Sequence, residues 1–254
     1  MTVEHAVFSP EVVKTLKLET AEGKERLAEA VLEYTETEMA RRIPLGEGKA
    51  GKVWVSDEKF FAQQACVKTI HNPDVSFNDL RKEFEMQQQF LEAGIPVPHP
   101  FCYVQGNGRT EARYGLMAMG RIHGETLERR LEEMHRRKET MTPKEFNELR
   151  DTLADIIKSM HRAHLYHRDL HLRNVMIDES NRLQIIDFGD ARQSIGDEEE
   201  RDAYRSDVVR DGKMITLVYP RDEDALGKLS QTVRELHLLQ KYETAPSLDS
   251  HAAP

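Results

Sequence analysis

Two short polar stretches in the second half of the chain hold the residues best suited to chemistry. The first, YHRDLHLRN, places Asp169 five residues before Asn174, and the second, IIDFG, contains Asp187. Apolar runs on both sides of a polar turn at 178–182 predict a β-hairpin that brings Asn174 and Asp187 close together. Their side-chain oxygens are suitable ligands for a divalent cation. Asp169 would lie on the connecting loop, where it can accept a proton from a hydroxyl that attacks a phosphate.

A lysine and a glutamate in the first half of the chain form a second candidate pair. Lys68 ends the apolar run ACVK, and its ammonium needs an anion if it points into a cleft. Glu83, on a helix expected to begin near Asn78, is the natural partner, and the pair would hold the lysine against phosphate oxygens. Glu85 is the competing candidate, but it lies about 200° around the helix from Glu83, so only one can face the cleft. Taken alone, Lys68 could equally be a surface lysine.

A glycine motif precedes Lys68 and has three interpretations. Gly46, Gly48 and Gly51 fit G-x-G-x-x-G, in which backbone amides approach phosphate oxygens closely. A dinucleotide-binding loop needs a strand before it and a helix after it, and this chain has the opposite context. A Walker loop needs Ser or Thr where Val53 stands. A glycine-rich hairpin over the phosphates remains, with Val53 against a nucleotide base, beside the alternative of an ordinary hairpin.

Composition limits the class of protein. The 254 residues include 36 Lys and Arg against 45 Asp and Glu, so the net charge of −9 gives no footprint for nucleic-acid binding. No apolar run approaches the ~18 residues of a membrane-spanning helix, and the N-terminus does not have the pattern of a secretion signal. With only Cys66 and Cys102, both in apolar surroundings, we expect a reduced, cytoplasmic protein.

Apolar periodicity indicates the elements that must position these residues. It predicts helices at 20–42, 78–91, 142–160 and 225–242, and strands at 52–55, 60–67 and 114–119. Thr142 and Glu145 can form a capping box at the start of the third helix. A joint at 120–124, where the pattern becomes mainly helical, separates two lobes. The expected divisions are an N-terminal helical extension at 1–42, an N-lobe with its hinge at 43–122, a C-lobe at 123–243 and a flexible tail at 244–254.

In this order the motifs resemble the eukaryotic-type protein kinase superfamily, from about Leu45 to Asp207. The matching segments are LGEGKAGKV, ACVK, a helix glutamate, HRD with an asparagine five residues on, and DFG. The resemblance implies an α+β fold with two lobes, a small antiparallel-sheet N-lobe and a shortened, mainly helical C-lobe. It also implies ATP and Mg²⁺ or Mn²⁺ as cofactors, and transfer of the γ-phosphate to a hydroxyl.

The resemblance also implies roles for individual residues. Asp169 would be the catalytic base, Lys68 would pair with Glu83, and Asn174 and Asp187 would hold the metal. Asp207 matches the family's buried aspartate that braces the HRD loop. The residues expected to bind the nucleotide are Leu45, Gly46, Gly48, Gly51, Val53, Lys68, Met119, Gly120 and Ile122, the last three at the hinge.

The chain departs from Ser/Thr protein kinases in ways that concern the acceptor. His171 stands two residues after Asp169, where those enzymes usually have Lys, and no Ala-Pro-Glu follows DFG. Only 67 residues follow Asp187, so we expect no standard peptide groove. The helix and proline-rich stretch at 82–98 resembles the compact RIO kinases, and the segment at 166–173 resembles bacterial lipopolysaccharide core kinases. We expect transfer to Ser or Thr of proteins, including autophosphorylation. The alternatives are a small-molecule or core sugar kinase, and a pseudokinase scaffold.

Three further features have two interpretations each. The histidines at 161, 164, 167 and 171 suggest zinc by spacing, but structural and loop roles fit better because no cysteine is near. Arg168 could pair with phosphate on Ser194, Tyr204 or Ser206, or with the carboxylates at 197–200, which could also be only a solvated acidic loop. The helix at 20–42 either packs on the N-lobe and steadies the Glu83 helix, or docks a partner.

Overall fold

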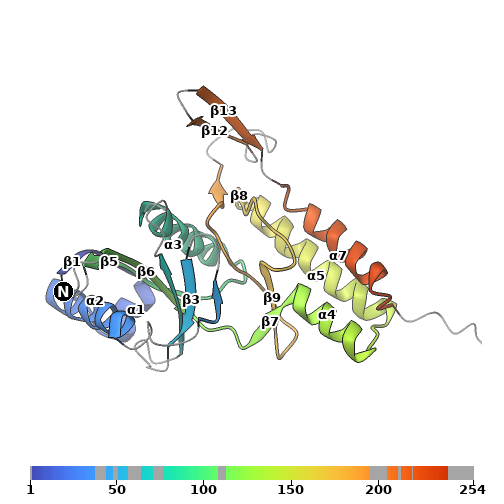
Figure 1. Ribbon diagram of the computed structural model, residues 1–254, viewed down its shortest axis with the longest axis horizontal. Helices are drawn as coiled ribbons and strands as arrows, with labels where there is room; N and C mark the ends of the chain where they lie inside the picture. The colour runs from blue at the N-terminus through green and yellow to red at the C-terminus, as the bar shows by residue number, and fades with distance from the viewer. Residues whose placement is uncertain are drawn as a thin grey trace, which may run out of the picture.

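The computed structural model describes residues 2–37, 44–47, 51–56, 64–70, 77–107, 113–194, 205–210, 213–218 and 220–239. It has an antiparallel sheet with flanking helices as one lobe and a mainly helical second lobe (Figure 1). The predicted α+β, two-lobed fold is therefore confirmed. Among these described residues, no helix has the length and apolar character needed to cross a membrane.

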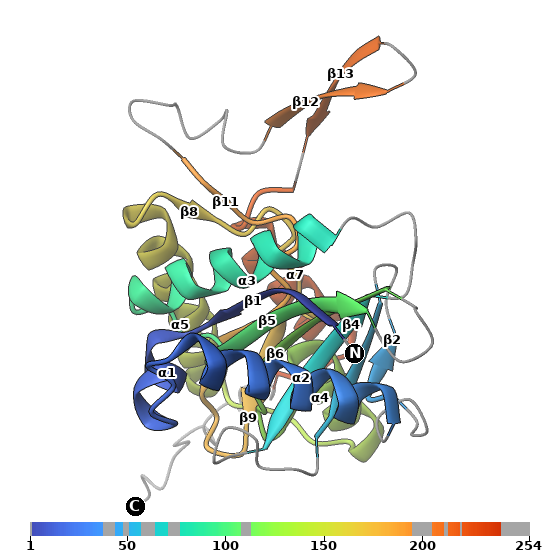
Figure 2. The same ribbon diagram turned by 90° about the vertical axis from the view of Figure 1, so that its left-hand side faces the viewer.

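The N-lobe is built on one six-stranded sheet in which every neighbouring pair is antiparallel. The strands, in spatial order, are β1 (Thr2–Phe8), β5 (Pro100–Asn107), β6 (Arg113–Gly120), β4 (Ala65–Ile70), β3 (Gly51–Val55) and β2 (Gly46–Glu47). Helix α3 (Phe77–Glu92) covers one face, while α1 (Pro10–Thr15) and α2 (Ala21–Thr37) cover the other (Figure 2). The sheet thus lies between two helical layers.

The N-terminal region differs from the helical extension expected at 1–42. Its helix is present as α2, but the region also contributes β1, which pairs with β5 so that Phe8 lies opposite Cys102. On α2, Val31 and Leu32 are buried in a cluster with Trp54 of β3. Strand β1 was missed because its partner lies about a hundred residues later in the sequence and its own apolar alternation is weak.

Packing of α2 on the N-lobe agrees with one of the two expectations for this helix. It lies on the face of the sheet opposite α3, so any effect on the Glu83 helix passes through the strands. Docking of a partner on α2 stays a prediction, and residues 38–43 lie outside the described part of the chain.

The C-lobe forms around one large apolar cluster. Thr142 and Glu145 make the predicted capping box at the start of α5, with Glu145 N–H to Thr142 Oγ1 at 3.1 Å. The C-lobe elements are β7 (Gly124–Thr126), α4 (Leu127–Arg137), α5 (Pro143–Arg162), β8 (Leu165–Tyr166), β9 (Val175–Asp178), β10 (Leu183–Ile185), β11 (Arg192–Gln193), β12 (Arg205–Arg210), β13 (Lys213–Val218) and α7 (Asp224–Glu235).

The last helix is shorter than predicted. The apolar pattern indicated residues 225–242, whereas α7 ends at Glu235. The Leu238 N–H donates to the Val233 carbonyl at 3.0 Å, and His237 adopts a left-handed φ of 53°, so the chain turns and Leu238 enters the C-lobe core. The apolar residues after 235 keep the helical spacing in the sequence, but the backbone there is no longer helical.

Candidate active site

The predicted hairpin brings Asn174 and Asp187 to the same end of its two strands. Strands β9 and β10 pair in antiparallel register with Ile185 opposite Val175. One step further, the Ile186 N–H donates to the Asn174 carbonyl at 3.0 Å. Asp187 follows with a left-handed φ of 67°, which turns the chain sharply out of the strand direction. The hairpin geometry inferred from the sequence is confirmed.

Asn174 also joins Asp169 to this group. Its side-chain Nδ2 donates to the Asp169 carbonyl at 3.0 Å and lies 3.4 Å from Asp169 Oδ2. Because the amide nitrogen is used in this way, the amide oxygen is left as the ligand atom of Asn174. His171 Nε2 lies 3.6 Å from Asp169 Oδ2 on the other side, beyond hydrogen-bonding distance.

Lys68 connects the two lobes at this point. Its Nζ lies 2.7 and 2.8 Å from the two carboxylate oxygens of Glu83 and 2.9 Å from Asp187 Oδ1. Glu85 instead pairs with Arg81, one turn earlier on α3, at 2.8 Å. Of the two glutamates considered from the sequence, the structure therefore places Glu83 beside the lysine.

Burial and charge set the ionisation of this triad. Burial alone would lower the pKa of Lys68, but the charges of Glu83 and Asp187 outweigh it and raise that pKa, so the ammonium is retained. Burial raises the pKa of Glu83, and the adjacent ammonium offsets this only in part. Asp187 is half exposed; burial acts against its ionisation, yet the Lys68 charge holds its pKa below the usual range. Asp187 is therefore a carboxylate at neutral pH.

The position of Glu83 depends on how α3 is held. Phe84 on α3 is fully buried against the sheet, and Gln87, one turn after Glu83, donates from Nε2 to the Pro98 carbonyl at 2.5 Å. Phe90, a further turn on, packs against Phe188 of the DFG segment with ring centroids 4.8 Å apart. Gln87 is a positioning residue that the sequence showed only as part of a helix face, because its acceptor is a backbone carbonyl eleven residues away.

The HRD loop is braced by Asp222, and the expectation that Asp207 does this is wrong. The Asp222 carboxylate accepts the backbone N–H groups of His167 and Arg168, both at 2.9 Å, and is fully buried. Asp207 instead lies in strand β12. Both aspartates follow DFG in the sequence, but Asp222 stands just before α7, which packs on α5, whereas Asp207 does not. A position just before the predicted last helix was the feature of the sequence that could have identified Asp222.

His167 fills the space behind the loop. It is completely buried, its Nε2 lies 2.9 Å from the Ile186 carbonyl, and its ring packs on Phe188 at 5.4 Å. Burial lowers the pKa of His167, so the ring is neutral and Nε2 carries the hydrogen that the carbonyl accepts. Phe188 contacts both His167 of the loop and Phe90 of α3. The loop, the segment after the β9–β10 hairpin and α3 therefore pack together.

The first and last glycines of the motif lie in two paired antiparallel strands, which fits both a hairpin over phosphates and an ordinary hairpin. Gly46 of β2 pairs with Val53 of β3, so neither flanking element is the helix that a dinucleotide-binding or Walker loop requires. Leu45 just before it is 64 % exposed, and Gly48 lies outside the described residues. Val53 is in turn opposite Lys68 on β4, which sets the glycine hairpin next to the lysine.

The residues expected at the hinge lie at and just after the end of β6, which pairs with β4 on the side away from β3. Met119 pairs with Cys66, and Gly120, the last residue of β6, pairs with Ala65 and donates its N–H to the His99 carbonyl at 2.8 Å. Ile122 follows outside any strand, and its N–H has no backbone partner among the described residues. These backbone groups join the two lobes.

A family profile described as the protein kinase domain matches residues 39–212, more than half of the chain. The chain belongs to the protein kinase domain family. The resemblance seen in the sequence to the eukaryotic-type kinase superfamily is thereby confirmed, while the likeness to RIO and lipopolysaccharide core kinases stays a prediction.

Named relatives are similar to this chain over little more than half its length. An Aurora kinase of Schizosaccharomyces pombe is 25% identical over 150 residues, 58% of this chain and 39% of its own. A putative cyclin-dependent kinase F-2 of Oryza sativa subsp. japonica is 29% identical over 153 residues, 58% of this chain and 45% of its own. The human hormonally up-regulated neu tumor-associated kinase is 27% identical over 150 residues, 57% of this chain and 20% of its own. The chain therefore spans less than half of the length of each of these relatives.

The histidines considered for zinc lie at separate places in the structure. His161 lies 3.3 Å from Asp222 and 3.2 Å from Glu223, His167 contacts the Ile186 carbonyl, and His171 lies beside Asp169. Within the described ranges, no three His, Cys, Asp or Glu side chains are grouped so that they could hold a metal.

Arg168 is buried with a left-handed φ of 68°, and the hydroxyl-bearing Ser194 is buried as well. Tyr204 and the carboxylates at 197–200, which were considered as partners of Arg168, lie outside the described residues, and the side chain of Ser206 is not described. The pairing of Arg168 with this segment stays a prediction.

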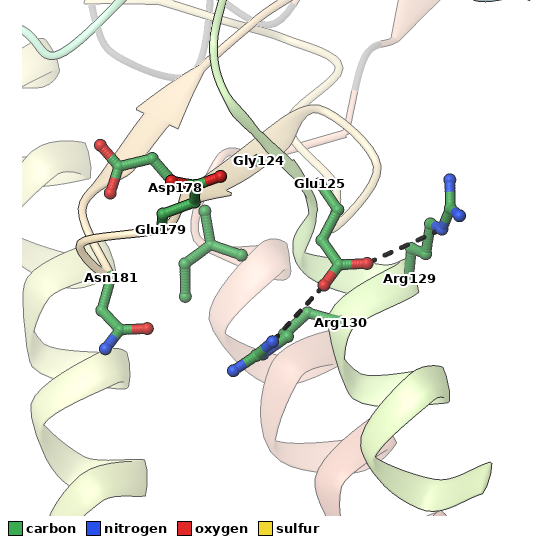
Figure 3. Close-up of a pocket in the computed structure, with 8 residues that line it drawn as sticks. Gly124, Glu125, Arg129, Arg130, Asp178, Glu179 and Asn181 are labelled. Atoms are coloured by element: carbon green, nitrogen blue, oxygen red, sulfur yellow. Dashed lines mark ion pairs between the residues drawn. The ribbon is translucent and has the colours of Figure 1, made fainter. Parts of the chain in front are cut away.

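One pocket lies away from the triad of Lys68, Glu83 and Asp187. It has a volume of about 500 Å³ between the start of α4 and the turn of the β9–β10 hairpin. Glu125 lies between the guanidinium groups of Arg129 and Arg130, at 3.7 and 3.6 Å (Figure 3). None of the predicted site residues lines this pocket, so it is separate from the candidate active site. Its lining is Gly124, Glu125, Arg129, Arg130, Ile177, Asp178, Glu179 and Asn181.

Proposed function

We propose that this chain is an ATP-dependent kinase that transfers the γ-phosphate to Ser or Thr hydroxyls of proteins, including its own. The observation that carries the proposal is the position of Lys68 Nζ, within 2.9 Å of both Glu83 and Asp187. A retained ammonium next to a carboxylate from the other lobe is the arrangement that can hold a polyphosphate and a cation side by side.

Asp169 is the proposed catalytic base. It is partly exposed, and Asn174 fixes its loop through the 3.0 Å bond to its carbonyl. The carboxylate can accept the hydrogen of an acceptor hydroxyl and align its oxygen toward the phosphorus. Catalysis of this kind depends on positioning and on neutralisation of charge.

Asn174 and Asp187 are the proposed ligands of Mg²⁺ or Mn²⁺. Both fit a hard cation because Asn174 keeps its amide oxygen and Asp187 keeps Oδ2, since its Oδ1 is paired with Lys68. A bound divalent cation would neutralise charge on the phosphate oxygens. Glu83 keeps the Lys68 ammonium in reach of the same phosphates.

The nucleotide is proposed to lie between the glycine hairpin and the hinge. Gly46, Gly48 and Gly51 would cover the phosphates, while Leu45 and Val53 would pack on the base beside Met119, Gly120 and Ile122. Two observations support this placement: Leu45 is the large apolar side chain most exposed among the described residues, and the Ile122 N–H has no backbone partner there.

Transfer of radiolabel from γ-labelled ATP tests the proposal. The purified chain is incubated with Mg²⁺ or Mn²⁺, alone and with a generic protein acceptor such as casein, and labelled residues are mapped. We expect label on Ser or Thr, and a loss of about 10³-fold or more in Asp187→Asn and about 10²-fold in Lys68→Met. Asp151→Asn, a surface aspartate paired with Arg150 on α5, is the matched control. Unchanged transfer in Asp187→Asn would refute the assignment.

A small-molecule acceptor is the second candidate. It is favoured by His171, which lies 3.6 Å from Asp169 Oδ2 at the place where a phosphate acceptor must approach. The same assay with a panel of sugars, including lipopolysaccharide core sugars, separates the two. Label on a sugar and none on protein would favour this candidate, and nucleotide binding with no label anywhere would indicate a scaffold.

A further inference from the structure

Strands β12 and β13 form a hairpin that stands apart from the other sheets. They pair only with each other among the described strands, with Asp207 opposite Thr216 and Arg210 opposite Lys213. Figures 1 and 2 both show the hairpin projecting beyond β8, β11 and the end of α3. The outer edge of β12 therefore offers its backbone N–H and C=O groups to a further strand.

An isolated hairpin of this composition needs a partner. Two-stranded hairpins are marginally stable in water, and this one has six apolar residues in its twelve strand positions. Successive residues of a strand belong to opposite faces, and the apolar residues stand at both odd and even positions of these strands. Each face of the hairpin is therefore assigned some apolar residues. The apolar strand residues are Val208, Val209, Met214, Ile215, Leu217 and Val218.

The sequence of β12 is complementary to itself when two copies run antiparallel. With Val208 opposite Val209 of a second copy, Asp207 falls opposite that copy's Arg210 and the reverse pair follows by symmetry. Two opposite-charge pairs then flank two valine pairs. A register shifted by two residues sets Arg205 opposite Arg210, so like charges disfavour it.

The charges inside the hairpin favour the same register. Arg210 lies opposite Lys213 in the register within one chain, and like charges at opposed positions are unfavourable. The Asp207 carboxylate of a second copy, opposite Arg210 on its free edge, would offset this repulsion.

We propose that the chain forms a two-fold symmetric homodimer through antiparallel pairing of β12 with β12 of a second copy. The result is a four-stranded sheet ordered β13, β12, β12, β13, and it leaves no free β12 edge. The hairpin begins and ends near the catalytic loop, because Ser194 donates to the His164 carbonyl before it and Asp222 holds the His167 N–H after it. The dimer therefore joins two chains through a segment anchored next to each active site.

Charge reversal at β12 tests this pairing. Analytical ultracentrifugation of the full chain at increasing concentration should show a dimer for the wild type. Asp207→Arg sets Arg against Arg, and Arg210→Asp sets Asp against Asp, so each variant should weaken the dimer by about tenfold or more. Equimolar mixing of the two variants should restore a heterodimer, and the double variant Asp207→Arg/Arg210→Asp should restore a homodimer.

Arg205→Asp is the matched control, because it changes the net charge as Arg210→Asp does but lies beyond the paired positions. It should leave the dimer unchanged. Circular dichroism and thermal unfolding establish that each variant is folded. A monomeric wild type, single variants that dimerise normally, or a mixture that stays monomeric would each overturn the proposal. Phosphate transfer is not part of the readout, so failure of the dimer and failure of the proposed kinase activity are independent results.

Discussion

The two sides of the candidate active site are held in different ways. On the C-lobe side, Asp169 and Asn174 lie on a loop whose backbone is bonded to one buried carboxylate, Asp222, and whose end is fixed by the β9–β10 register. On the N-lobe side, Lys68 and Glu83 come from a strand and a helix that meet only through side chains. The first arrangement is set by backbone hydrogen bonds, and the second by the packing of α3.

This difference indicates which side can change shape. Breaking the C-lobe arrangement leaves buried backbone N–H groups without a hydrogen-bond acceptor, which lowers the free energy of unfolding. Breaking the N-lobe arrangement requires that α3 rotate or shift so that Glu83 leaves both the Lys68 ammonium and the Phe188 backbone N–H, with the sheet intact. We therefore expect variants on the C-lobe side to lose stability, and variants around α3 to lose activity with a smaller loss of stability.

The largest effect should come from removing the N-terminal layer of the sheet. Deletion of residues 2–37 removes four buried apolar side chains and exposes the sheet surface that they cover. Burial of each contributes roughly 1.5–3 kcal/mol to the free energy of unfolding. The four are Phe8, Val12, Val31 and Leu32. Their sum is comparable with the whole stability of a domain, about 5–15 kcal/mol, so the truncated chain should lose cooperative thermal unfolding.

A graded variant keeps this first test interpretable. Leu32→Ala should lower the free energy of unfolding by about 2–5 kcal/mol. If the truncated chain instead melts cooperatively near the wild-type temperature and only loses binding to a partner, the docking interpretation of α2 would be correct and the layer would not be structural.

Removal of the brace behind the catalytic loop comes next. Asp222→Ala leaves the buried N–H groups of His167 and Arg168 without their acceptor, at about 1–3 kcal/mol each. Denaturant unfolding should show the loss, and Asp222→Asn, which keeps one oxygen acceptor, should lose less. Asp207→Asn, measured at a concentration low enough to keep the chain monomeric, is the control. If it destabilised the chain as much as Asp222→Asn, the correction of the brace from Asp207 to Asp222 would be undone.

The sequence predicted most of what depends on local pattern. The β9–β10 hairpin, the capping box and the strands on either side of the glycine motif follow from spacing within one or two elements, and all are present. Spacing also showed that only one of Glu83 and Glu85 can face the cleft, and the structure places Glu83 there. The failures concern distant partners. Strand β1 needed β5, about a hundred residues away, and the brace needed to be assigned between two aspartates that both follow DFG. Periodicity contains no information on which distant surface an element meets.

Gln87 tests whether the N-lobe side is set by packing. Gln87→Leu keeps the volume and helix propensity but removes the bond to the Pro98 carbonyl, so α3 should be less firmly fixed and Glu83 less often paired with Lys68. We expect kcat to fall about tenfold with a stability loss near 1 kcal/mol, the size of one hydrogen bond. Gln88→Leu, its neighbour on α3, is the matched control. An equal fall in both variants would mean that the bond to Pro98 has no positioning role.

The smallest effect concerns pH on the C-lobe side. Burial lowers the pKa of His167 below its usual 6.5, so in acid the unfolded chain binds a proton there that the folded chain does not. Stability due to this site is therefore full above pH 6.5 and falls as the pH drops below it. His167→Phe should be about 1 kcal/mol less stable at pH 7, because it loses the contact with the Ile186 carbonyl, yet its stability should decline less toward pH 5. Urea midpoints at both pH values measure this. If the two curves stayed parallel, His167 would have to accept its proton in the folded state, and the loop would be more open to water than its burial indicates.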